Sequence, residues 1–191
     1  TPYADYVVTT AAGRQLSPAS ISAADPELTL LHTIRFGGLE QGWIYARANP
    51  ASRLPPSALP EPVVFDRRVQ LRALAAEVVA GRVQVRARWQ LLQANGRYTV
   101  QVQIRDEQGR VWAQPEFPLV NDVSFYPEDW APDEAPVVGY EVDLPDAAPP
   151  GDYRIALTLF DSRTGDQLPV TSESGAFLGL VYPGPAFAWP P

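Results

Sequence analysis

Two segments of this chain show the same alternation of apolar and polar residues. Tyr98–Asp106 and Tyr153–Asp161 each begin with Tyr, place an aliphatic residue at every second position and end at Asp. Gly109 and Gly165 follow a few residues later. A period of two followed by Gly predicts a β-strand that enters a turn. Because both strands have an apolar face to bury, we predict that they lie in the core of a β-sandwich.

The segment before the first of these strands is also alternating. Its apolar positions are Val83, Val85, Ala87, Trp89 and Leu91. The positions between them are Arg or Gln, which predicts an antiparallel strand with one buried face. Such an arginine row can bind phosphates or anionic lipid headgroups. More often it is a solvated strand face or pairs with acids on a neighbouring strand.

The first 48 residues predict a small unit of their own. Ala4–Thr10 has the character of a short strand. Ser17 before Pro18 is a helix-start signal, so we expect a short helix over Pro18–Ala24. Thr29–Phe36 and Leu39–Ala46 flank a Gly-Gly pair, which predicts a β-hairpin. Residues 1–48 therefore predict a β-α-β-β unit.

Proline-rich stretches suggest the limits of the sandwich. Asn49–Pro62 contains five prolines, and proline cannot donate to a strand ladder. We expect 49–62 to be a linker or strap, 63–182 the sandwich and 183–191 a Pro-rich tail. Val69–Ala80 fits a helix or a strand. The fold class predicted is mainly β: an Ig-like or jelly-roll β-sandwich preceded by a small α/β unit.

Composition narrows the function classes. The chain has 191 residues, no Cys and a net charge of −7. The negative charge argues against a nucleic-acid partner, which requires positive surface. No apolar run is long enough for a transmembrane segment. The chain begins at Thr1 and has no Met, which we interpret as a fragment or a processed product.

The residue types that carry catalysis are scarce. The single histidine, His32, falls inside a predicted strand, and no Gly-x-Ser-x-Gly segment accompanies it. We expect His32 to be structural, and we expect no metal and no cofactor. Asp106 and Asp161 can be interpreted as a carboxylate pair of the glycosidase kind. Each precedes a Gly turn, however, and Asp in that place bonds its own backbone. We expect them to be turn residues.

The stretch from Asn121 to Glu134, within a predicted loop over Pro115–Pro136, is the best candidate site. It offers aromatic faces that can stack on a sugar ring and carboxylates of the type that calcium takes as ligands, although the spacing is not that of an EF-hand. The candidate ligand-binding residues are Phe125, Tyr126, Glu128, Asp129 and Trp130. The alternative is a long loop whose aromatic residues fold back onto the core.

Several segments share a pattern with a known family: Ala4–Val8, Thr33–Glu40, Gly42–Tyr45, Gly81–Trp89, Tyr98–Val102, Asp106–Arg110, Pro149–Arg154, Leu159–Asp161 and Thr164–Pro169. They resemble the extracytoplasmic C-terminal region of bacterial protein-mannosyltransferase-like membrane glycosyltransferases of the dolichyl-phosphate-mannose type. In that family the catalytic acids lie in loops between membrane helices. This chain has no such helices, so the resemblance implies no catalytic residue here.

The resemblance implies a non-catalytic, extracytoplasmic accessory domain. Such a domain would assist glycan or acceptor binding, or pack on the membrane part of the same protein. The alternative is a free-standing carbohydrate-binding or adhesion module that uses Tyr126 and Trp130. A third possibility is a hydrolase that uses the loop carboxylates Glu128 and Asp129.

Overall fold

The computed structural model describes residues 3–10, 17–36, 39–48, 56–93, 96–121, 125–130 and 134–190. The chain divides into two compact units, Thr1–Arg53 and Leu54–Pro191. The first contains one helix and a small sheet, and the second contains two larger antiparallel sheets. No helix in the described part of the chain is long and apolar enough to cross a membrane.

The first unit has the element order expected from its sequence. Its elements are β1 (Tyr3–Thr10), α1 (Pro18–Ala24), β2 (Leu28–Phe36) and β3 (Leu39–Ala48). The sheet order is β1-β3-β2, and both pairings are antiparallel. Ser17 caps α1 by accepting a hydrogen bond from the Ser20 backbone N–H at 3.2 Å. The predicted helix and hairpin are therefore confirmed, while Gly37 and Gly38 lie outside the described residues.

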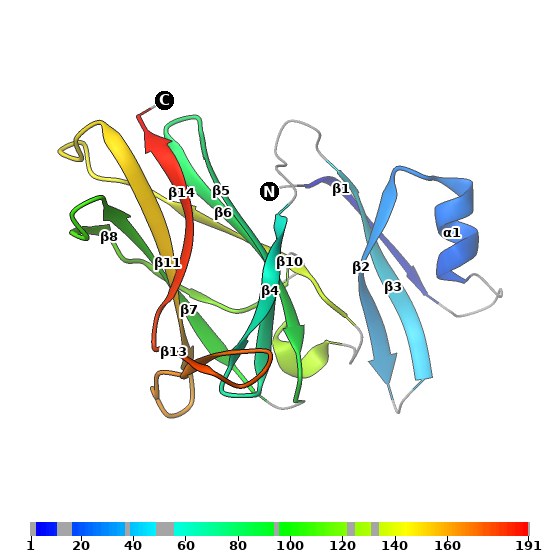
Figure 1. Ribbon diagram of the computed structural model, residues 1–191. Helices are drawn as coiled ribbons and strands as arrows, with labels where there is room; N and C mark the ends of the chain where they lie inside the picture. Colours follow the sequence, from blue (N-terminus) through cyan, green and yellow to red (C-terminus); the bar gives the residue numbers. More distant parts are fainter. Residues whose placement is uncertain are drawn as a thin grey trace. The chain divides into compact units, whose positions relative to one another are not determined.

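The second unit is a β-sandwich (Figure 1). One sheet has the order β10-β6-β5-β4-β12-β13 and the other β14-β11-β7-β8, with β9 also paired to β7. The first sheet contains β4 (Ser57–Phe65), β5 (Val69–Val79), β6 (Arg82–Leu91), β10 (Val137–Val142), β12 (Val170–Ser172) and β13 (Phe177–Gly179). The second contains β7 (Tyr98–Asp106), β8 (Val111–Ala113), β9 (Glu116–Pro118), β11 (Gly151–Asp161) and β14 (Tyr182–Trp189). The mainly-β sandwich prediction is confirmed.

The two segments with matching patterns are partners in the five-stranded sheet. β7 and β11 pair in one unbroken antiparallel register, in which Tyr98 lies opposite Asp161 and Asp106 lies opposite Tyr153. Residues opposite one another share a face, so the aliphatic positions of both strands point to the same side. Those positions are Val100, Val102, Ile104, Ile155, Leu157 and Leu159, all with no exposed surface.

Side chains from both sheets meet in the core. Phe117 of β9 packs against Tyr140 of β10 with ring centroids 5.3 Å apart. Gly184 of β14 lies close to Leu74 of β5. In the six-stranded sheet, Phe65 and Trp89 are fully buried, with ring centroids 5.7 Å apart. The interlocking apolar faces supply the main stabilisation of the sandwich.

Two proline-rich stretches expected to lie outside the sandwich are strands. β4 begins at Ser57 and includes Pro60 and Pro62. Its pairing with β5 is regular at Ala58 and from Val63 onwards, and the register shifts between them. The prolines occupy that irregularity, where no ladder N–H is required. Residues 49–55 of the expected linker lie outside the described residues.

The expected tail is strand β14. It contains Pro183 and Pro185 and, among the described strands, pairs with β11 alone, at the edge of its sheet. An edge strand leaves one side without a ladder, so proline is tolerated there. The segment that fitted a helix or a strand, Val69–Ala80, forms β5, and Ala80 and Gly81 make the turn into β6 with positive φ angles of 49° and 78°.

Candidate functional site

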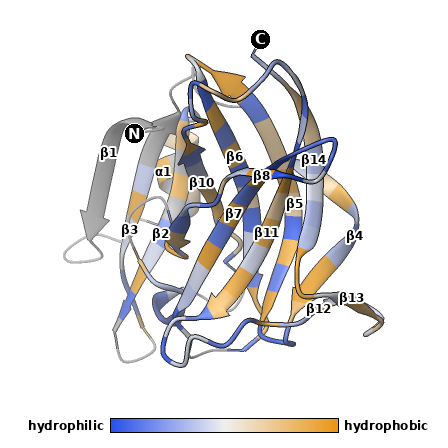
Figure 2. Cartoon of the chain, turned by 90° about the vertical axis from the view of Figure 1, so that its left-hand side faces the viewer, coloured by the Kyte–Doolittle hydropathy of each residue, from blue (hydrophilic) through white to orange (hydrophobic). Residues whose placement is uncertain are grey.

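The outer side of the five-stranded sheet carries a continuous row of polar side chains. These residues occupy the positions between the aliphatic ones on β7 and β11 (Figure 2). Gln101, Gln103 and Thr158 are buried, whereas Thr99 and Arg105 are half-buried and Arg154 is exposed. We define the polar face as Thr99, Gln101, Gln103 and Arg105 of β7 with Arg154 and Thr158 of β11. Cross-strand partners are Gln101 with Thr158 and Arg105 with Arg154.

Hydrogen bonds link three β7 residues of the polar face, Arg105, Gln103 and Gln101, into one chain. Arg105 donates from Nε to Gln103 Oε1 at 3.0 Å, and its Nη2 donates to the same oxygen. Gln103 Nε2 donates to Gln101 Oε1 at 2.8 Å, and Gln101 Nε2 donates to Glu116 Oε1 at 3.1 Å. Every amide oxygen therefore points toward the arginine and every amide nitrogen toward the glutamate. The chain fixes the orientation of both amides before any ligand arrives.

Thr158 is an exception within the polar face. It is 1% exposed, and its hydroxyl oxygen has no hydrogen-bond partner among the residues that the structure describes. Buried hydroxyl groups are nearly always paired, because burial without a partner is unfavourable. The unpaired Thr158 hydroxyl, opposite Gln101 in the strand register, is thus expected to lower the stability of the sheet.

A pocket of about 490 Å³ lies at one end of the polar face. Thr99 lines it, and the Thr99 and Ser162 hydroxyl oxygens are 2.9 Å apart. We call it the Tyr126 pocket; its lining residues are Arg97, Thr99, Pro118, Tyr126, Ser162 and Arg163.

Arg97 organises the Tyr126 pocket. Its guanidinium lies over the Tyr126 ring, 4.6 Å from the centroid, and donates to Glu128 Oε1 from Nε at 2.9 Å and from Nη2 at 2.7 Å. Arg163 Nη2 reaches Glu128 Oε2 at 3.2 Å. The hydrogen bond from Arg97 lowers the pKa of the Glu128 carboxyl, so this group is a carboxylate at neutral pH.

The candidate loop residues divide between the pocket and the core. Tyr126 and Glu128 meet at the Tyr126 pocket, as described above. Trp130 is 6% exposed and donates its indole N–H to the Phe125 carbonyl at 3.0 Å, and Phe125 packs against the core cluster. Asp129 is exposed at the end of the 3-10 helix η2 (Pro127–Asp129). Trp130 therefore offers no open face for sugar stacking, and the folded-back alternative holds for it.

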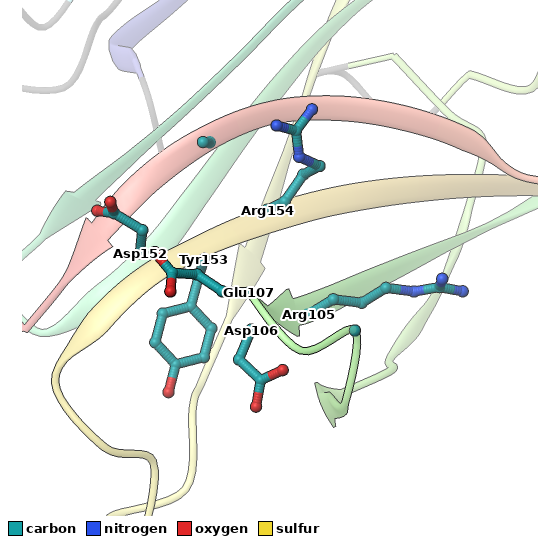
Figure 3. A pocket seen from close by; sticks show the side chains of 8 residues that line it. Arg105, Asp106, Glu107, Asp152, Tyr153 and Arg154 are labelled. Atoms are coloured by element: carbon teal, nitrogen blue, oxygen red, sulfur yellow. The ribbon is translucent and has the colours of Figure 1, made fainter.

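A second pocket of about 480 Å³ lies at the other end of the polar face (Figure 3). We call it the Arg154 pocket; its lining residues are Arg105, Asp106, Glu107, Gly109, Asp152, Tyr153, Arg154 and Ala186. Thr99 and Arg105, which line opposite pockets, are separated by six residues of β7, or about 20 Å. The two pockets thus mark the ends of an elongated surface.

Asp106 serves the turn rather than the pocket. Its carboxylate accepts hydrogen bonds from Trp112 Nε1 at 2.8 Å and from the backbone N–H groups of Gln108 and Arg110 at 3.0 and 2.8 Å. The bond from Trp112, followed by those from the backbone, lowers the pKa of this carboxyl. The expectation that Asp106 bonds its own turn is confirmed.

Asp161 has the same role at the opposite end of the strand pair. It accepts from the Arg163 backbone N–H at 2.9 Å and from Arg68 Nη1 at 2.9 Å. In the antiparallel register Asp106 lies opposite Tyr153, eight residues from Asp161, or about 26 Å along the strand. Catalytic carboxylate pairs are separated by about 5–9.5 Å, so these two cannot form one.

The arginine row on β6 is partly neutralised by acids. Arg82 forms ion pairs with Asp143 at 3.0 Å and with Glu141 of β10 at 3.4 Å. Pairing with acids of a neighbouring strand is therefore confirmed for Arg82. Arg86 is 6% exposed, so the prediction of a solvated face is wrong at that position, whereas Arg88 is exposed.

Side chains of the kinds that bind metal ions do not form a cluster in the described part of the chain. No group of three or more His, Cys, Asp or Glu side chains lies together there. Asp122 and Asp133, two of the loop carboxylates, lie outside the described residues. His32 is buried within β2.

The comparisons with known proteins give structural likenesses alone. No protein-family model and no curated protein matches the sequence. A calcium-binding mutant of Bacteroides uniformis beta-glucuronidase 2 matches 75% of this chain with a TM-score of 0.35 and 11% identity. A Bacteroides fragilis protein assigned as a beta-galactosidase matches 70% with a TM-score of 0.30 and 8% identity. The matches span 16% and 18% of those longer chains.

Proposed function

We propose that this chain is a non-catalytic carbohydrate-binding β-sandwich module and that the polar face is its binding surface. The observation that carries the proposal is the hydrogen-bonded chain from Arg105 through Gln103 and Gln101 to Glu116. Its groups are held in place on a rigid sheet, so binding requires little ordering of side chains.

The chemistry of the polar face suits sugar hydroxyl groups. A hydroxyl both donates and accepts hydrogen bonds, and an amide side chain offers two donors and an acceptor. Each of Gln101 and Gln103 uses one amide hydrogen within the chain, and the other amide hydrogen of each would meet a ligand through the small part of the residue that is exposed, 7% and 8%. The surface between the two pockets is elongated, as is an oligosaccharide.

The carboxylates beside the two pockets favour binding over catalysis. Glu128 is held as a carboxylate by Arg97 and Arg163, and Asp106 by its turn donors. Both have lowered pKa values, whereas a general acid needs a pKa near the working pH. Neither group is suited to donate a proton to a leaving sugar at neutral pH.

In this proposal the module is an extracytoplasmic accessory region of a membrane glycosyltransferase-like protein. The sequence resemblance supports that placement, and the polar face supports the part of it that concerns glycan or acceptor binding. A free-standing binding module would use the same surface.

The experiment is a glycan-array screen of the purified chain, followed by calorimetric titration of each glycan that binds. Gln103→Leu interrupts the hydrogen-bonded chain at its centre, and we expect the dissociation constant to rise about tenfold or more. Arg88→Gln, an exposed change on the outer side of the other sheet, is the matched control and should bind as the wild type does. No binding across the array, or equal binding by the Gln103→Leu variant, would contradict the proposal.

A further inference from the structure

Two arginines are cross-strand neighbours at one end of the polar face. Arg105 and Arg154 are directly opposite in the β7–β11 register and both line the Arg154 pocket. Like charges in this arrangement destabilise an antiparallel pair. A bound anion would turn this unfavourable contact into a favourable one.

Neither arginine forms an ion pair with any residue that the structure describes. Arg105 is braced by the neutral Gln103 through Nε and Nη2, which leaves its Nη1 available. Arg154 makes one long hydrogen bond of 3.4 Å, from Nη1 to the Gly184 carbonyl. Arg154 therefore retains Nε and Nη2, the pair that binds a carboxylate with two parallel hydrogen bonds, and Arg105 retains Nη1 as a further donor.

The acidic residues of the Arg154 pocket point away from the two guanidinium groups. In Figure 3 the side chains of Glu107 and Asp152 extend to the left, whereas Arg154 extends upward and Arg105 to the right. Asp106 is occupied by the donors of its own turn. The small side chain of Ala186, opposite Arg154 on β14, leaves room beside the guanidinium.

From this geometry we propose that Arg105 and Arg154 bind the carboxylate of an acidic sugar, so that the glycan recognised by the polar face carries a uronic acid. The inference rests on the proposed glycan-binding function and adds the chemical class of the ligand. Gln101 and Gln103 would bind hydroxyl groups of the same saccharide, and Gln103 would also hold Arg105 in position.

The test measures binding of uronic acid trisaccharides in acid form and as neutral methyl esters, with inorganic sulfate as a simple anion. The variants are Arg105→Gln and Arg154→Gln, with Arg88→Gln as the matched control. The acid should bind the wild type at least about tenfold more tightly than the ester, the typical effect of charge-assisted hydrogen bonds. Either pocket variant should remove that difference, and Arg88→Gln should keep it.

Thermal unfolding supplies a second readout that does not depend on the choice of sugar. Without ligand, Arg154→Gln should raise Tm above that of the wild type, because it removes a like-charge contact. Arg105→Gln removes the same contact but also both hydrogen bonds to Gln103, so its Tm should lie below that of Arg154→Gln. With the acid trisaccharide the order of the wild type and Arg154→Gln should reverse, since only the wild type gains the full stabilisation of binding.

The outcomes separate this inference from the function it rests on. Equal binding of acid and ester, unchanged in both pocket variants, would overturn the acidic-sugar inference and leave the glycan-binding function in place. Protection by sulfate in the absence of saccharide binding would overturn both, and would leave only a simple anion site. If neither the trisaccharides nor any array glycan bound, both would again be wrong.

Discussion

Trp89 donates its indole N–H to the phenolic oxygen of Tyr140 at 2.9 Å, and both side chains are almost fully buried. The bond joins β6 to β10, and the Tyr140 ring packs against Phe117 of the opposite sheet. A polar contact between two large aromatic residues thus lies in the middle of an otherwise apolar core.

Tyr140→Phe should lower the free energy of unfolding by about 1–3 kcal/mol, because it leaves the Trp89 N–H buried without this partner. Urea unfolding measures the change. Tyr182→Phe is the matched control, since the Tyr182 hydroxyl makes no hydrogen bond with the described residues. Equal stability of the two variants would mean that the Trp89–Tyr140 bond contributes nothing.

Thr158→Val should raise the free energy of unfolding by about 1 kcal/mol. It replaces a buried hydroxyl that has no partner by a methyl group of similar shape. Thr99→Val provides the contrast, because the Thr99 hydroxyl bonds to Ser162 and its loss should be neutral or destabilising. A marked loss of stability in the Thr158→Val variant would show that the hydroxyl has a partner after all.

Gly184→Ala should destabilise the sandwich by about 1–3 kcal/mol through overpacking. A Cβ at Gly184 would lie 2.5 Å from Ile155 Cγ1 and 3.0 Å from Leu74 Cδ2, within the core. Gly139→Ala is the control, since a Cβ there meets nothing within 4 Å. Differential scanning calorimetry should show a lower Tm for the Gly184 variant alone; equal Tm values would contradict the close packing of β14.

Asp106→Asn should reduce stability at neutral pH and have little effect in acid. The pKa of the Asp106 carboxyl is lowered in the folded protein, chiefly by the Trp112 hydrogen bond. A lowered folded pKa gives stability that is present above the unfolded pKa, about 4, and is lost as the pH falls through the folded value. Urea midpoints of the two proteins should therefore differ at pH 7 and converge as the pH falls through the folded value. A difference that stayed constant over this range would assign the effect to something other than the ionised carboxylate.

Local patterns predicted those parts of the fold that depend on local chemistry. The Ser17 cap, the α1 helix and the alternation in β7 and β11 follow from nearby residues. Whether a strand tolerates proline depends on which strand lies beside it, and local sequence does not contain that information. The prolines of β4 and β14 therefore predict a linker and a tail where the structure has strands. Only the folded sheets reveal that their prolines sit at an irregularity or an edge.

The candidate site was predicted in part for the same reason. Tyr126 and Glu128 reach a pocket, but Arg97 and Arg163 come from distant segments that no local pattern connects to them. The burial of Trp130 likewise depends on core residues that are distant in the sequence, so the local pattern did not predict it. The signal for the polar face was present in the sequence, since Gln101, Gln103 and Arg105 alternate with aliphatic residues. The pairing of these residues with Arg154, opposite Arg105, could not be predicted, because it depends on the register between β7 and β11.

The central claim is that the polar face of the five-stranded sheet binds glycan. The most direct measurement is a nuclear magnetic resonance titration with the glycan that binds most tightly on the array. We expect saturable shifts in the side-chain amide signals of Gln101 and Gln103 and in the Arg105 Nε–H signal, with the signals of Gln90 and Arg88 in the other sheet unaffected. No binding glycan, or shifts confined to the outer side of the six-stranded sheet, would contradict it.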